Sequence, residues 1–72
     1  MKKIKKIKIK LNGKSKMIQG DYKIKDLISD LKIPLKKVAI ELNQEILDKK
    51  KLSEVKIKKN DKIEIVHFIG GG

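Results

Sequence analysis

Residues 6–11 alternate strictly between lysine and aliphatic side chains, and an Asn-Gly pair follows them directly. This alternation is typical of a half-buried β-strand, with the aliphatic side chains facing the core and the lysines facing water. Asn12 and Gly13 give the strongest short signal for a tight hairpin, because both residues tolerate the positive φ of a type I′ turn. The pattern therefore predicts that residues 14–18 return as a second, antiparallel strand.

The next segment changes its hydrophobic period from two residues to that of a helix. Its apolar residues stand at positions i, i+3, i+4 and i+7, which predicts one buried helical stripe: Ile24, Leu27, Ile28 and Leu31. We expect Pro34 to end this helix, because a residue before proline is pushed out of the helical region. Lys23 is a poor N-cap, and Asp21 serves only if the helix starts early. At about ten residues, the helix depends on packing rather than on propensity.

Three more strands are expected in the second half of the chain. Asn43-Gln44 is the predicted tight turn between two of them, and Ile63 and Ile65 face the core from the last. The three segments cover residues 38–42, 45–47 and 62–68. We therefore predict an α+β fold with a mixed sheet of four to five strands packed on one main helix. The last strand is expected at the centre, beside the first.

Length and composition exclude several classes of protein. A chain of 72 residues is predicted to form one domain, 1–72, that buries about 60% of its unfolded surface, too little for a deep enzyme pocket. It has no cysteine, so no disulfide, thiolate metal site or thiol nucleophile is expected. It has no apolar run near the ~20 residues of a membrane span. Its basic start lacks the apolar region of a secretory signal, and we expect a cytoplasmic location.

The charge allows a second class of function, binding to nucleic acid. The net charge is +11, and all 20 basic residues are lysines. Arginine, the usual bidentate partner of phosphate and guanine, is absent, and aromatic residues for base stacking make up only 3%. The lysines are also spread along the whole chain. These features favour a solvated lysine surface, with nucleic-acid binding as the weaker alternative.

The sequence ends in three glycines that directly follow an apolar strand pattern. Glycine contributes no packing and loses the most backbone entropy on ordering, so stability does not explain the run. A backbone without side chains can enter a narrow channel. Terminal glycines also occur as mobile ends, but the adjoining strand favours a function. We predict that Gly72 presents a working α-carboxylate on a flexible tail of about residues 67–72, with Gly71 and Gly70 as its slim arm.

The chain resembles the ubiquitin-like β-grasp sulfur carriers. The resemblance lies in the hairpin, the helix and two segments, Val38-Ala39-Ile40-Glu41-Leu42-Asn43 and 61–72. Within that group the chain is most similar to the thiamine-biosynthesis carriers of the ThiS family, and only residues 1–5 look like an extension. The Gly-Gly end is shared with the small subunit of molybdopterin synthase. A carrier of that type, or a ubiquitin-like protein modifier, is therefore the alternative.

The resemblance implies a function for the tail. In the family, a ubiquitin-activating-type adenylating enzyme uses ATP and Mg²⁺ to turn the terminal carboxylate into an acyl-adenylate. A sulfur donor protein then converts it to a thiocarboxylate, which supplies thiazole synthase. By this resemblance Gly72 carries the sulfur. The chain is a protein cosubstrate rather than an enzyme, with no bound cofactor, no catalytic residue and no metal site.

The alternation of side chains along a strand predicts which residues face outward and could contact a partner. If Ile63 and Ile65 face inward, Glu64, Val66 and Phe68 face outward, and the neighbouring strand adds Ala39. We predict that these four residues form a docking surface near the tail, since exposed apolar patches mark interaction sites. The alternative is that Val66 and Phe68 merely cover an edge.

The single histidine, His67, stands where the last strand meets the tail. It has no cysteine, serine or carboxylate cluster at catalytic or metal-ligand spacing. We predict a structural or partner-contact role for it.

Overall fold

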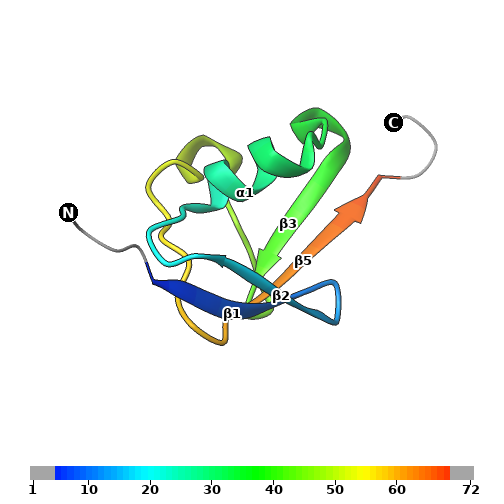
Figure 1. Cartoon of the computed structure of the whole chain (residues 1–72). Coiled ribbons are helices and arrows are strands. Elements are labelled where there is room, and N and C mark those ends of the chain that lie inside the picture. The colour runs from blue at the N-terminus through cyan, green and yellow to red at the C-terminus, as the bar shows by residue number, and fades with distance from the viewer. Residues whose placement is uncertain (1–4, 69–72) are drawn as a thin grey trace.

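The computed structural model describes residues 5–68, in which one α-helix packs against a five-stranded mixed sheet (Figure 1). The elements are β1 (Lys6–Leu11), β2 (Lys14–Gln19), α1 (Ile24–Leu31), the 3₁₀ turn η1 (Leu35–Lys37), β3 (Val38–Leu42), β4 (Glu45–Ile46), the 3₁₀ turn η2 (Lys49–Lys51) and β5 (Lys62–His67). The sheet order is β2-β1-β5-β3-β4. β1 and β5 are parallel, and the other pairs are antiparallel.

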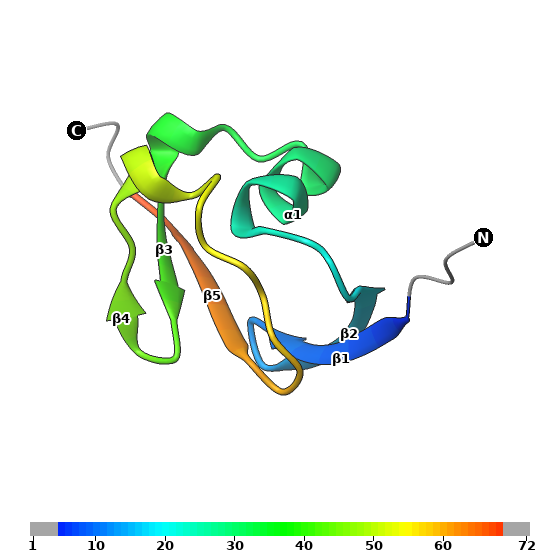
Figure 2. The ribbon, with the colours of Figure 1, turned by 90° about the vertical axis from the view of Figure 1, so that its left-hand side faces the viewer.

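This arrangement is the ubiquitin-like β-grasp fold, so the predicted fold class is confirmed. β5 lies at the centre of the sheet beside β1, as the sequence predicts. Figure 2 shows the sheet curving around α1 on one side, while no helix of the described part of the chain covers the opposite face. The last strand of the chain is therefore held between two neighbours.

The first hairpin has the predicted turn, with φ of 50° at Asn12 and 81° at Gly13. Behind β2, Gly20 has a role beyond ending the strand. Its N–H donates to the carbonyl oxygen of Lys5 at 2.7 Å, and a Cβ at this position would lie 2.6 Å from that oxygen. Only glycine permits this close approach without displacing the Lys5 backbone.

The helix begins at Ile24, as the apolar stripe predicts, but it ends earlier than expected. Lys23 is the N-cap residue, and the Asp26 carboxylate accepts from the Lys23 N–H at 2.8 Å. An acid three residues into the helix thus satisfies a free amide at the helix start, and Asp21 is not needed. The helix ends at Leu31 because Lys32 adopts a left-handed conformation with φ of 54°. Pro34 therefore does not set the end, and α1 is shorter than the ten residues expected.

The core lies between α1 and the sheet. Within residues 5–68, eleven apolar side chains are buried in it: Ile9, Ile18, Ile24, Leu27, Ile28, Val38, Ile40, Leu52, Ile57, Ile63 and Ile65. The inward positions predicted for Ile63 and Ile65 are confirmed. Ile57 was not predicted, because it stands alone among lysines and shows no periodic pattern. In the described part of the chain, no helix is long and apolar enough to cross a membrane.

Candidate carrier tail and docking surface

β5 leads directly to the glycine tail and is fixed by backbone pairing on both sides. Ile63 pairs with Leu11 of β1 and with Leu42 of β3. The pairing with β3 continues to His67, and the Phe68 N–H then donates to the Lys37 carbonyl at 2.9 Å. The chain is thus held to Phe68, one residue beyond the start of the predicted tail of about 67–72. The residues predicted as the arm and the sulfur-carrying group, Gly70, Gly71 and Gly72, lie outside the described residues.

Two asparagine side chains hold β5 from opposite sides. Asn12 Oδ1 accepts from the Ile65 N–H at 2.7 Å, and Asn12 Nδ2 lies 3.5 Å from the Ile65 carbonyl oxygen. Asn43 Oδ1 accepts from the Lys62 N–H at 2.9 Å, and Asn43 Nδ2 donates to Asp61 at 3.1 Å. Both asparagines are in left-handed turns. Each turn therefore aims a side chain at the strand that carries the tail.

These side-chain hydrogen bonds to β5 were not predicted, because the sequence indicates only turns at both asparagines. No local signal identifies this second role, because asparagine is favoured at such turn positions for its tolerance of positive φ alone.

Strand pairing brings the predicted docking residues together. Ala39 lies opposite Val66, and Glu41 lies opposite Glu64. Val66 is 49% exposed and Phe68 is 52% exposed, while Ala39 is half-buried. β5 pairs with β1 only up to Ile63, whereas its pairing with β3 continues past Val66, so Val66 lies beyond the part of β5 that has a strand on both sides. The predicted outward orientation of Glu64, Val66 and Ala39 on the open face of the sheet is confirmed, and Phe68, which directly follows the end of β5, is exposed near the tail.

Two further residues adjoin this surface. Ile46 lies opposite Glu41, on the same open face, and is 74% exposed. The Lys49 ammonium is 5.1 Å from the centre of the Phe68 ring, within the range of a cation–π contact. Neither was predicted: β4 is too short to show alternation, and the contact to Lys49 depends on tertiary structure.

His67 and Tyr22 are two ionisable side chains of the described region whose surroundings the structure shows. His67 is exposed at the end of β5, and no group of three or more His, Cys, Asp or Glu residues within residues 5–68 could hold a metal ion. Tyr22 donates its phenolic hydrogen to the Asp30 carboxylate. This hydrogen bond raises the pKa of Tyr22 above 10.0, and burial and the nearby negative charges act in the same direction. The pair joins the segment before α1 to the helix.

The fold, with its central last strand running into a glycine tail, defines a small ubiquitin-like β-grasp protein. Comparisons with known proteins give the family. The ThiS family model matches residues 9–72. The sulfur carrier protein ThiS of Bacillus subtilis is 42% identical over 65 residues, which cover 89% of this chain and 98% of that protein. The chain belongs to the ThiS family.

Two further relatives extend the comparison. The crystal structure of the thiamine biosynthesis protein ThiS from Geobacter metallireducens matches with a TM-score of 0.82 and 29% identity, covering 92% of this chain and all of that one (100%). Thiazole synthase of Paramagnetospirillum magneticum is 36% identical over 66 residues. The match covers 92% of this chain but only 20% of that protein. The chain therefore spans about a fifth of the length of this longer relative.

Proposed function

We propose that the chain carries sulfur as a thiocarboxylate on Gly72. As a member of the ThiS family it is a sulfur carrier for thiamine biosynthesis rather than a catalyst. The single observation that supports the role of the tail is the position of β5. This strand is paired with β1 at its start and with β3 up to His67, and its backbone is held as far as Phe68, four residues before Gly72. A rigid domain thus presents a short glycine arm.

The chemistry has to make a carboxylate electrophilic. We propose that an adenylating enzyme of the ubiquitin-activating type supplies ATP and Mg²⁺. A Gly72 carboxylate oxygen attacks the α-phosphorus, and pyrophosphate leaves. The terminal sulfur of a donor persulfide then attacks the carbonyl carbon, and AMP leaves with the electrons of the C–O bond. A second thiol then attacks the donor sulfur of the resulting acyl disulfide: the S–S bond breaks, the thiocarboxylate leaves with its electrons, and the thiol and the donor are left joined as a disulfide. In this proposal the adenylating enzyme binds ATP and Mg²⁺, and the carrier supplies only the carboxylate.

The proposed docking surface consists of Ala39, Glu64, Val66 and Phe68. It combines exposed apolar side chains with a carboxylate beside the tail, and such patches mark interaction sites. The acceptor we propose is thiazole synthase. The match to one part of a longer thiazole synthase supports this partnership, because that polypeptide includes a segment similar to this chain. We place both reactions in the cytoplasm, together with the ATP that the first one consumes.

Charge reversal at Glu64 tests the docking surface. Glu64 is exposed on the open face, so Glu64→Lys is expected to keep the thermal midpoint and to slow thiocarboxylate formation by the adenylating enzyme. Asp21→Lys is the control, because it reverses a negative charge in the same way at an exposed position outside the surface. Equal rates for the two variants would count against this docking surface. A chain extended by one residue after Gly72 is expected to form no thiocarboxylate.

A further inference from the structure

A groove lies between α1 and the segment that follows β4, on the helix side of the molecule. Its volume is about 490 Å³, within the range of ligand-sized pockets. Lys25 and Lys32 line it from the α1 side, and Lys49 and Lys50 line it from η2. The two pairs of lysines come from separate segments of the chain, and the fold brings them to one groove.

The charged side chains that line the groove are all positive. None of its ten lining residues, all within the described range, is a carboxylate. Asp26, Asp30 and Asp48 lie close in sequence to lining residues but do not themselves line the groove; their carboxylates accept from the Lys23 N–H, Tyr22 and the Lys50 N–H. The positive potential of the groove is therefore not cancelled by its own walls.

The floor of the groove is aliphatic. Ile28 and Leu52 are buried, and Ile33 and Leu35 are half-buried. No lining residue is aromatic, so nucleic-acid bases find no stacking surface there. A simple anion would use the lysines but not the floor. An aliphatic floor under a lysine rim matches a peptide that has an apolar anchor flanked by carboxylates.

The groove adjoins the proposed docking surface. Lys49 lines the groove, and its ammonium is also 5.1 Å from the centre of the Phe68 ring. Leu35 lines the groove from η1, and in the same turn Lys37 accepts the backbone hydrogen bond of Phe68. A partner that grips the tail beyond Phe68 therefore lies beside the opening of the groove.

We propose that the groove binds an acidic segment of the adenylating enzyme, with an aliphatic side chain on the floor and Asp or Glu side chains against the lysines. This inference rests on the proposed function, since it assigns a second contact to the enzyme that acts on Gly72. Charged pairs at the rim of an interface mainly speed association and fix orientation. The contact is thus expected to act on KM rather than on kcat.

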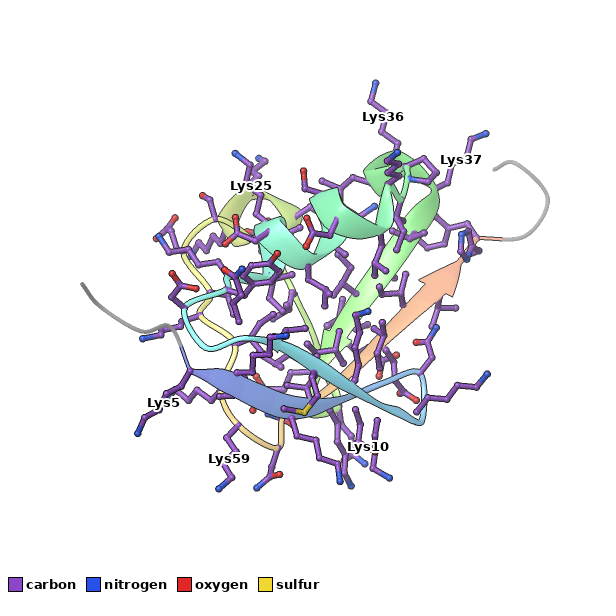
Figure 3. All side chains as sticks on the ribbon, viewed as in Figure 1. Lys5, Lys10, Lys25, Lys36, Lys37 and Lys59 are labelled. Atoms are coloured by element: carbon purple, nitrogen blue, oxygen red, sulfur yellow. The ribbon has the colours of Figure 1, made fainter. Side chains whose placement is uncertain are left out.

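The test compares two double variants with the same net charge. Lys25→Glu with Lys50→Glu changes both walls of the groove, whereas Lys5→Glu with Lys59→Glu changes two exposed lysines at the far end of the molecule (Figure 3). Steady-state AMP release is measured with the adenylating enzyme, ATP and a sulfur donor. At low salt the groove variant is expected to raise KM about tenfold with kcat unchanged, and the control less than about twofold. At high salt the difference in KM between the two double variants should disappear, because salt screens the charges.

Each outcome has one meaning. If the wild-type chain releases AMP and both double variants raise KM equally, the assignment of the groove is wrong although the proposed function stands. If the wild-type chain releases no AMP, the proposed function itself fails. Circular dichroism verifies that both variants are folded. Binding of a single-stranded DNA that the groove variant loses and the control keeps would also overturn the assignment.

Discussion

Replacing Asn12 by glycine tests whether the first hairpin turn holds the strand that carries the tail. Asn12→Gly keeps the φ of 50° accessible but removes the 2.7 Å hydrogen bond to the Ile65 N–H. The longer contact at 3.5 Å adds little. One hydrogen bond contributes about 1 kcal/mol, and a buried amide left unpaired costs up to about 3 kcal/mol. Because Ile65 is only 7% exposed, we expect a loss of about 1–3 kcal/mol.

Asn60→Gly is the matched control. Asn60 also has a positive φ, 69°, and its backbone N–H donates to the Lys8 carbonyl, a bond that glycine keeps. We expect Asn60→Gly to change stability by less than about 0.5 kcal/mol. Each kcal/mol corresponds to about 4–8 °C in Tm for a domain of this size, so calorimetry resolves the two variants.

Hydrogen exchange locates the effect. If exchange of the Ile65 amide proceeds through opening of this contact, Asn12→Gly should speed it by about five- to 150-fold, the equivalent of 1–3 kcal/mol. The reasoning is refuted if Asn12→Gly and Asn60→Gly have the same Tm and the Ile65 amide keeps its protection.

Three other perturbations follow from single contacts. Gly20→Ala places a Cβ against the Lys5 carbonyl, and we expect urea unfolding to show a loss of about 1–3 kcal/mol. Gln44→Gly relieves a φ of 74°; part of the gain is offset by a more flexible unfolded chain, so a stabilisation of about 0.5 kcal/mol is expected by the same measurement. The raised pKa of Tyr22 means that its bond to Asp30 stabilises the fold below pH 10.0 and that this stability is lost as the pH rises through the folded-state pKa. Tyr22→Phe should abolish that part of the alkaline decline in Tm.

The sheet could be predicted because its signals are local. Strict alternation in residues 6–11 and the pair Asn12-Gly13 determine a strand and its turn within eight residues. The central place of β5 follows from chain order and the parallel pairing that the fold class requires. Val66 faces outward because Ile65 faces the core and successive side chains in a strand point to opposite faces of the sheet.

The features that the sequence did not reveal depend on contacts between distant segments. Ile57 is buried although its flanking lysines suggest an exposed loop. The helix ends at a left-handed Lys32, a residue with no intrinsic preference for positive φ. The hydrogen bonds from Asn12 and Asn43 to β5 join residues of separate elements, and so does the groove between α1 and η2. No spacing in the sequence could indicate either feature.

The central claim is that the carboxylate of Gly72 becomes a thiocarboxylate. The most direct test is the intact mass of the chain after incubation with the adenylating enzyme, ATP, Mg²⁺ and a persulfide donor, with the chain extended beyond Gly72 as the control. We predict a mass gain equal to the replacement of one oxygen by one sulfur, localised to Gly72 by fragmentation, and an unchanged control. An unchanged mass for the wild-type chain, with no AMP released, would contradict the account.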